Sequence, residues 1–498
     1  MRKKIVLYWS KKQLHAEGEV KMHEYYESPL CKRYAGNEMK RVFSDDVRFA
    51  TWRKLWIALA ESEKELGLPI TDAQIAELKA HVDDIDYDFA AAKEKEVRHD
   101  VMAHVHAYGE CCPNAKGIIH LGATSCYVCD NADVIIQRQA MLLIKRELLA
   151  AISAVAEFAE KYKGVPTLAY THFQAAQPTT VGKRATLWLQ DLLMDLEQVD
   201  FALANMKLLG CKGTTGTAAS FLELFDGDAE KVKELERRII AKLGFGSAYA
   251  VSGQTYTRKA DFALLSVLSG IAQSAHKFSN DIRLLSHLKE VDEPFEKGQI
   301  GSSAMAYKRN PMRSERIASL ARYCICDLTN PAITAASQWL ERTLDDSANR
   351  RIAIPEAFLC VDAILALYIN VISGLKVYPK IMEKHLKEEL PFMVTENILM
   401  YCVAHKGGDR QQLHEAIRGH SVAAAEQVKL YGGENDLLDR IIADDTFGLT
   451  REELDGILDA GGFTGLAEKQ TEEFLAGPVK AALDANAGFE AVNVEINV

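Results

Sequence analysis

The chain has 498 residues, of which 48% are hydrophobic and 26% charged, a balance typical of globular proteins. At roughly 150 residues per domain this length predicts about three structural units, and the composition excludes a chain that is mainly disordered. Lys and Arg number 59 against 70 Asp and Glu, a net charge of −11, which argues against a general surface for nucleic acid or anionic membrane. An anionic small molecule would need a local group of cations.

The N-terminal part of the chain is predicted to form short helices. Apolar residues recur at helical spacing between Ser44 and Gly67, and the turn from Leu68 to Asp72 ends that helix. Thr71 is expected to cap the next helix. Short helices joined by tight turns are therefore expected over residues 28–110.

Long helices are predicted in the middle of the chain, where prolines are scarce. Proline breaks helix interiors, and no proline lies between residues 113 and 166 or between residues 178 and 294. Residues 131–164, 182–209 and 257–293 can each hold one helix, and apolar residues in the third follow alternating steps of three and four. Strand signals are poor throughout. The sequence therefore predicts an all-α fold with a central bundle of long helices.

The ten cysteines are scattered and no secretory signal is recognised, so a reducing, cytoplasmic location is expected. Cys126 and Cys129 form a single C-x-x-C without a second ligand pair, which favours buried small side chains over a metal site. No apolar run approaches the ~18 residues of a transmembrane helix, so no membrane partner is expected.

Two segments are dense in polar groups. From Ser302 to Arg316 there are four cations and one anion, a local charge of +3, with hydroxyl and amide groups between them. Cations with neutral donors bind carboxylates and phosphates, so a binding site is favoured over a solvated loop. Residues 341–351 hold three acids and three bases, and there a surface lattice of ion pairs is favoured over a substrate site.

Two histidines lie among polar neighbours, His99 between Arg98 and Asp100, and His172 after Thr171. A lone histidine is more often structural, and it is also the commonest general acid or base near neutral pH. Both interpretations stay open on these residues alone. His120, which lies between nearby glycines, is interpreted as structural.

The polar segments resemble those of a known family. Gly301–Asn310 is similar to the signature of the fumarase/aspartase superfamily, whose members eliminate fumarate from succinyl compounds, and residues 308–316 resemble the adenylosuccinate lyases within it. The resemblance covers roughly residues 28–475. Further similar blocks follow in the family's order at residues 28–35, 98–106, 120–128, 171–174, 213–217, 253–258 and 341–351.

This resemblance implies anti β-elimination of fumarate from adenylosuccinate, giving AMP, and from the succinylated imidazole carboxamide ribotide of purine biosynthesis. It implies no metal and no organic cofactor. It also implies a homotetramer, in which helices of four subunits form one core and active sites are shared between subunits. The expected parts of the subunit are an N-terminal helical domain at 1–124, with 1–27 an unassigned extension, a central bundle at 125–377 and a C-terminal helical domain at 378–498.

The resemblance also assigns roles to individual residues. His172 is similar to the general acid that protonates the departing nitrogen, and Ser302 to the general base that removes a proton beside a carboxylate. His99 matches a histidine that positions the substrate and its phosphate. Substrate-binding positions are matched by Arg33, Tyr34, Arg98, Asp100, Thr124, Ser125, Gln254, Lys308, Asn310, Arg316, Arg342, Ser347 and Arg351.

Two alanines depart from the family pattern. Ala306 and Ala175 stand where prolines are usual, which leaves the backbone freer and predicts slower loop ordering without loss of chemistry. Two alternative functions are another lyase of the superfamily, such as argininosuccinate lyase or fumarase, and a non-catalytic helical scaffold. Residues 313–316 and 345–350 argue against the first, and the retention of His172 and Ser302 argues against the second.

Overall fold

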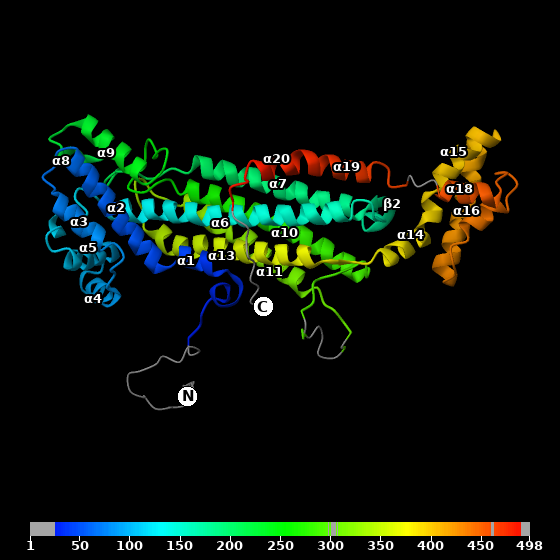
Figure 1. The fold of residues 1–498 in the computed structure, drawn as a ribbon, viewed down its shortest axis with the longest axis horizontal. Helices are drawn as coiled ribbons and strands as arrows, with labels where there is room; N and C mark the ends of the chain where they lie inside the picture. Colours follow the sequence, from blue (N-terminus) through cyan, green and yellow to red (C-terminus); the bar gives the residue numbers. More distant parts are fainter. Residues whose placement is uncertain (1–24, 297, 300–304, 306, 460–462, 490–498) are drawn as a thin grey trace, which may run out of the picture.

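Long helices lie side by side along the length of the molecule and shorter helices gather at both ends (Figure 1). The computed structural model describes residues 25–296, 298–299, 305, 307–459 and 463–489. The predicted all-α fold is confirmed: only four short strands accompany the helices in this part of the chain. The longest helices are α6 (Ser125–Lys161), α7 (Val181–Asn205), α10 (Lys259–His287) and α13 (Asp345–Gly374).

The three helices predicted from proline-free stretches correspond to α6, α7 and α10. The apolar residues predicted to form a seam on α10 are all buried in the core of the bundle. At the centre of this core the ring of Phe278 stacks on Tyr368, with centroids 3.8 Å apart, and meets Trp188 edge-on at 5.1 Å. Helical spacing of apolar residues therefore identified the face that the bundle buries.

Helix α13 was not predicted, because it contains a proline. Pro355 removes one backbone hydrogen bond from the helix interior. The helix continues because its residues on both sides of Pro355 pack against α6, α10 and α11 (Met312–Asp327). Among the described residues, α13 alone is long and apolar enough to cross a membrane, and 72% of its most apolar 18-residue window is buried inside the protein.

Short helices form the N-terminal end. The predicted helix from Ser44 is α2, and Thr71 caps α3 through a reciprocal capping box with Gln74. A separate apolar core joins this region to the start of α6, with Trp52 and Trp56 at its centre. The elements are η1 (Leu30–Tyr34), α1 (Asn37–Val42), α2 (Asp45–Glu65), α3 (Asp72–Ala80), α4 (Tyr87–Val97), α5 (Asp100–Cys111) and η2 (Lys116–Ile118), with α8 (Ala219–Leu224) and α9 (Ala229–Lys242) beside them.

Two pairs of short strands lie at the other end of the bundle. β1 (Pro166–Thr171) and β2 (Gln174–Thr180) form an antiparallel hairpin between α6 and α7, and β3 (Val291–Asp292) pairs with β4 (Lys376–Val377). The sequence did not predict the hairpin, because its residues show no clear alternation and Pro178 lies inside β2. Proline is tolerated there because a two-stranded sheet has only edges.

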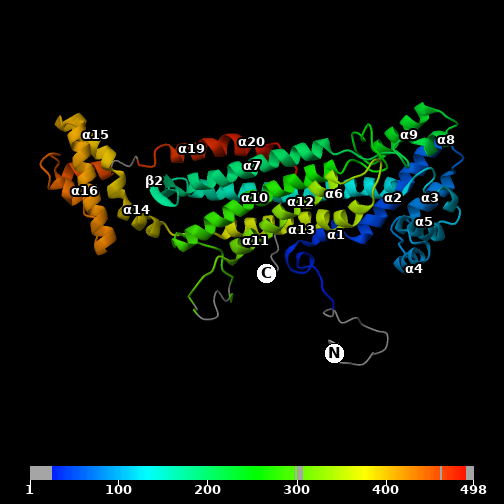
Figure 2. The same cartoon turned by 180° about the vertical axis from the view of Figure 1, so that it is seen from behind.

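The C-terminal part forms a third apolar core around Ile398, Leu413 and Phe447. The chain then returns to the bundle, where α19 (Ala467–Phe474) and α20 (Lys480–Asp484) run along α7 (Figure 2). The domain boundaries expected at 124 and 377 stay a prediction. The remaining helices are α12 (Thr329–Ala336), α14 (Pro379–Met393), α15 (Thr395–Lys406), α16 (Arg410–Tyr431), α17 (Leu437–Ile442), α18 (Arg451–Asp459), α19 (Ala467–Phe474), η3 (Leu475–Val479) and α20 (Lys480–Asp484).

Candidate active site

A cavity of about 900 Å³ lies where the N-terminal helices meet one end of the bundle. Its walls come from α2, the α4–α5 junction, the first turns of α6, the loop before α10 and the start of α13. Segments more than 200 residues apart in the sequence therefore meet here. Eight of the predicted site positions line this cavity: Arg98, His99, Asp100, Ser125, Gln254, Arg342, Ser347 and Arg351.

The Arg98–His99 turn is shaped by two helix ends. Arg98 ends α4 in the left-handed conformation, with φ of 56°, and His99 is the N-cap of α5. The left-handed region is costly for a residue with a Cβ, so this turn is strained and held by its surroundings. Thr124, another predicted position, is the N-cap of α6, directly before Ser125.

The hydrogen bonds of His99 define its tautomer. Its Nδ1 accepts from the backbone N–H of Met102 at 3.3 Å, and its Nε2 lies 3.2 Å from Ser125 Oγ. A backbone N–H can only donate, so Nδ1 must be unprotonated and Nε2 carries the hydrogen of the neutral ring. His99 therefore presents an N–H donor on the side of Ser125.

Asp100 is held by an ion pair across the cavity wall. Arg351 Nη2 lies 2.7 Å from Asp100 Oδ2, and the backbone N–H of Val101 donates to Oδ1 at 2.8 Å. Burial favours a higher pKa for Asp100, but the hydrogen bonds from Arg351 and Val101 outweigh it and hold the pKa below its ordinary value. Asp100 is thus a carboxylate that orients Arg351.

Buried ion pairs support this wall from behind. Arg258 Nη1 lies 2.9 Å from Asp130 on α6, and its Nε lies 2.7 Å from Asp346 on α13. Arg350 Nε lies 2.7 Å from Asp261 on α10. These pairs tie three long helices together at the cavity, and buried charges of this kind are costly unless paired.

The segment 341–351 is more than a surface lattice of ion pairs. Asp346 and Arg350 are only 1% and 8% exposed, so that interpretation was wrong about where these charges lie. Arg342 pairs with Asp346 at 3.3 Å while lining the cavity, as Ser347 and Arg351 do. The segment thus supplies both the cavity wall and its support.

Other predicted positions lie apart from the cavity. The guanidinium of Arg316, on α11, lies 5.8 Å from the ring centroid of Tyr34, and that of Arg33 lies 6.0 Å from it. Asn310 lies beside Asp292 and Arg309, and Lys308 is exposed. Ser302 and Ala306 lie outside the described residues.

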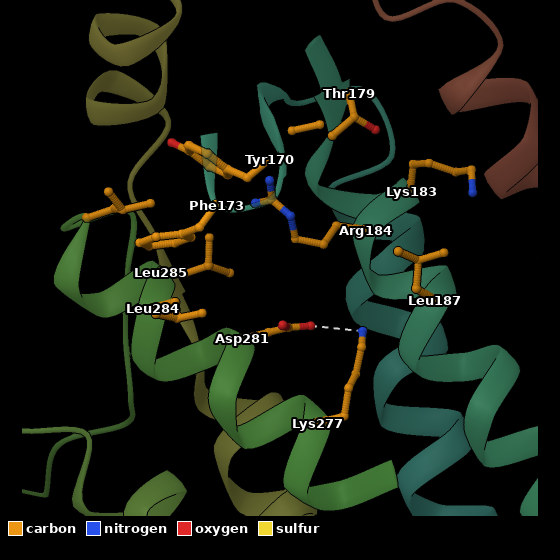
Figure 3. A pocket seen from close by; sticks show the side chains of 12 residues that line it. Tyr170, Phe173, Thr179, Lys183, Arg184, Leu187, Lys277, Asp281, Leu284 and Leu285 are labelled. Carbon is orange, nitrogen blue, oxygen red and sulfur yellow. Dashed lines mark hydrogen bonds and ion pairs between the residues drawn. The ribbon is translucent and has the colours of Figure 1, made fainter. Parts of the chain in front are cut away.

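His172 is exposed at the tip of the β1–β2 hairpin. Thr171 pairs with Gln174, so His172 and Phe173 form a two-residue turn, and both have positive φ, 55° and 57°. Such turns favour glycine and asparagine, so this tip is strained. The hairpin leads on to a second cavity of about 530 Å³, with Phe173 and Tyr170 at its rim and α7 and α10 as its floor (Figure 3).

One chain does not bring His172 to the larger cavity. Ser125 begins α6 and the hairpin follows the end of this 37-residue helix, which spans about 55 Å at 1.5 Å per residue. The structure thus gathers eight predicted residues at one end of α6 and places His172 beyond the other.

Arg48 lines the larger cavity and was not predicted. Its guanidinium lies over the rings of Trp52 and Phe49, 5.1 Å and 5.6 Å from their centroids. Within the described part of the chain its guanidinium has no carboxylate within ion-pair distance. The only sequence signal is a cation on an amphipathic helix, which does not distinguish it from any surface arginine.

Cys126 and Cys129 lie in the first turns of α6. Cys126 is buried and Cys129 is partly buried, and burial raises the pKa of the Cys126 thiol to about 12. Among the described residues no group of three or more His, Cys, Asp or Glu side chains is arranged to hold a metal ion.

The lowered pKa of Asp100 predicts a pH-dependent effect of Asp100→Asn. A depressed carboxyl pKa stabilises the fold fully above the unfolded value of about 3.9, and this contribution disappears as the pH falls through the folded-state pKa. Asp100→Asn should therefore lower the free energy of unfolding by about 1 kcal/mol at pH 7 and by much less at pH 3. Urea denaturation measures this.

The matched control is Asp83→Asn, because Asp83 is exposed and makes no ion pair among the described residues. Its effect should be small at both pH values. An Asp100→Asn effect that persists unchanged at pH 3 contradicts the ionic role of Asp100.

Known proteins resemble this chain over most of its length. A family profile described as Lyase matches residues 36–325, and one described as Adenylosuccinate lyase C-terminus matches residues 391–474. Adenylosuccinate lyase of Saccharomyces cerevisiae is 54% identical over 464 residues, 93% of this chain and 96% of that protein. Adenylosuccinate lyase of Schizosaccharomyces pombe is 52% identical over 467 residues, 93% and 97% of the two chains.

Solved structures share the fold. A fumarate lyase from Mesorhizobium sp. BNC1 has a TM-score of 0.76 at 22% identity, covering 89% of this chain and 99% of that one. The 3-carboxy-cis,cis-muconate lactonizing enzyme of Pseudomonas putida has a TM-score of 0.77 at 21% identity, covering 91% and 98%. Together with the identity to the yeast proteins over almost the whole of both chains, these matches show that the chain belongs to the adenylosuccinate lyase family of the fumarase/aspartase superfamily.

Proposed function

We propose that this protein cleaves adenylosuccinate to AMP and fumarate, and the succinylated imidazole carboxamide ribotide to its carboxamide and fumarate. The observation that carries the proposal is the larger cavity, which gathers eight positions that resemble the family's substrate-binding residues. Its relatives in two yeasts are named for the first of these substrates.

The charges around the cavity suit such a substrate. Adenylosuccinate carries a phosphate and two carboxylates, which arginine binds well through paired N–H groups. Arg48, Arg98, Arg342 and Arg351 line the cavity of a protein whose net charge is −11. The ion pairs behind Arg342 and Arg351 favour fixed positions for two of these cations.

The proposed reaction needs one base and one acid. Ser302 takes the proton from the carbon beside a carboxylate, and the resulting dianionic carbanion is stabilised by cations and N–H or O–H donors placed at that carboxylate. The C–N bond then breaks, its electron pair goes to the nitrogen, and His172 donates the proton that completes the amine. The products are fumarate and AMP, and no metal or organic cofactor takes part.

A serine is a weak base in water, so the proposal requires a dry site. The segment around Ser302 begins with glycine and small residues, which suits a loop that closes over the substrate and excludes water. Lys308 and Asn310, further along this loop, are proposed to hold the carboxylate next to the proton that leaves.

We further propose a homotetramer with shared active sites. The separation along α6 supports this, because a cavity in one subunit needs the hairpin of another. Exposed apolar side chains on α7 also support it: Leu187, Met194 and Phe201 are 50%, 56% and 67% exposed along one helix. Apolar surface of this extent favours association.

A direct assay tests the activity. Purified protein should cleave adenylosuccinate, followed by ultraviolet absorbance, and should leave argininosuccinate and malate unchanged. His172→Ala and Ser302→Ala should each lower turnover by about 100- to 10,000-fold, the usual contribution of a general acid or base. Absence of adenylosuccinate cleavage by the unaltered protein would falsify the proposal, and a loss in Ser303→Ala but not in Ser302→Ala would show the wrong serine was chosen.

Mixing two inactive variants tests the shared site. Coexpressed His172→Ala and Arg351→Ala chains should form mixed tetramers in which some sites combine an intact hairpin with an intact cavity. Activity should then rise clearly above the sum of the two variants measured separately. A mixture no more active than that sum contradicts sharing between subunits.

The two roles of His99 can be separated by substitution. Asparagine is a good N-cap, so His99→Asn should keep α5 and change the free energy of unfolding little, while His99→Ala should cost about 0.5–2 kcal/mol. Both lose the Nε2 donor, and both should lower kcat/KM by about 100-fold. Full activity in His99→Asn would mean that His99 serves only as a helix cap.

A further inference from the structure

Glu290 is a fully buried carboxylate beside the base of the β1–β2 hairpin. Its Oε1 lies 2.9 Å from Nδ1 of His385 on α14, and its Oε2 lies 3.9 Å from Nη1 of Arg184 on α7. No described atom makes a hydrogen bond to Oε2. A buried carboxylate is costly unless polar or charged partners compensate it, and here one such partner comes from each of two helices.

Arg184 connects this carboxylate to the hairpin. Its Nη2 donates a hydrogen bond to the backbone carbonyl of Leu168 in β1. Figure 3 shows the guanidinium directed to the hairpin strands, near Tyr170. The position of β1 is therefore coupled, through Arg184, to the carboxylate of Glu290.

His385 connects the same carboxylate to the C-terminal helices. Helix α14 packs on β1 and β2, and the backbone N–H of Tyr378, directly before α14, donates to the Glu290 carbonyl at 2.9 Å. Tyr378 Oη donates to Asp292 at 2.8 Å. Glu290 thus contacts α14 twice. Its backbone carbonyl accepts a hydrogen bond at the start of the helix, and its side chain contacts His385 in the second turn.

The hairpin needs such support. A two-stranded hairpin is marginally stable by itself. His172 and Phe173 both adopt left-handed backbone conformations, which cost roughly 1–2 kcal/mol per residue, and both side chains are exposed at the tip. The geometry of the tip must therefore be imposed from the base, where β1 meets Arg184 and α14.

We propose that Glu290 is a positioning residue whose carboxylate, held between Arg184 and His385, fixes the hairpin that carries His172. This inference rests on the proposed function, in which His172 is the general acid. The inference also means that α14 and the C-terminal helices beyond it influence how His172 protonates the leaving nitrogen. They do so by holding the hairpin in place, although they lie outside the larger cavity.

The decisive variants are at His385, because they leave the buried Glu290–Arg184 pair intact. His385→Leu removes the side-chain N–H that faces the Glu290 carboxylate, and His385→Arg retains an N–H donor there. We expect His385→Leu to lower kcat for adenylosuccinate by about 10- to 100-fold while KM stays within about twofold, since misplacement of a reacting group by about 1 Å has effects of this size. His385→Arg should restore kcat. Glu290→Gln should lower kcat in the same way.

The matched control is a second histidine–carboxylate pair in the C-terminal part. His420 Nε2 lies 2.8 Å from Asp444, and the side chain of His420 is 27% exposed against 24% for His385. This pair packs near Phe447, away from the hairpin. His420→Leu should therefore leave kcat unchanged.

Hydrogen exchange gives a readout independent of activity. Amides of residues 166–180 should exchange faster in His385→Leu than in the unaltered protein, His385→Arg or His420→Leu. Unchanged kcat and unchanged exchange in His385→Leu overturn the inference, as does an equal loss of kcat in His420→Leu. Failure of the unaltered protein to cleave adenylosuccinate overturns the proposed function instead.

Discussion

The length of helix α6 is the constraint on which the arrangement of functional groups depends. Ser125 begins this 37-residue helix at the larger cavity, and the hairpin with His172 follows its other end. A helix of about 55 Å cannot be shortened by side-chain motion. Within each chain, the residues that line the larger cavity are therefore kept apart from His172, the proposed general acid. This separation is why we propose that several subunits together complete one active site.

The bundle also makes the cavity rigid. Ion pairs between five buried residues cross from helix to helix at one level of the bundle. The five are Asp130 on α6, Arg258 directly before α10, Asp261 on α10, and Asp346 and Arg350 on α13. Each charge is nearly excluded from water. Loss of Arg258 would therefore leave the buried carboxylate of Asp130 without its cation. The arginines that face the cavity therefore rest on a layer whose positions are fixed by the packing of long helices.

Sequence patterns identified the helices better than the contacts between them. Periodicity predicted α6, α7 and α10, but the rule that proline ends helices excluded α13, because Pro355 is tolerated where burial on both sides maintains the helix. The hairpin was missed because short strands carry little periodicity. Charge density at 341–351 was misjudged as surface, and Arg48 was not noticed, because burial and cavity walls arise from tertiary contacts that local sequence does not encode.

The segment Glu290–Glu296 contacts three parts of the chain that lie far apart in the sequence. Glu290 supports the hairpin and α14, while Asp292 pairs with Arg309 at 3.7 Å, at the end of the signature segment. Glu293 accepts hydrogen bonds from the backbone N–H groups of Arg313 and Ser314, which the first turn of α11 would otherwise leave unsatisfied. Three acids in one short stretch thus fix the base of the His172 hairpin, the end of the signature loop and the start of the C-terminal helices relative to one another. A shift of α14 is therefore transmitted through this segment to the base of the hairpin, which couples the C-terminal helices to the hairpin that carries the proposed acid.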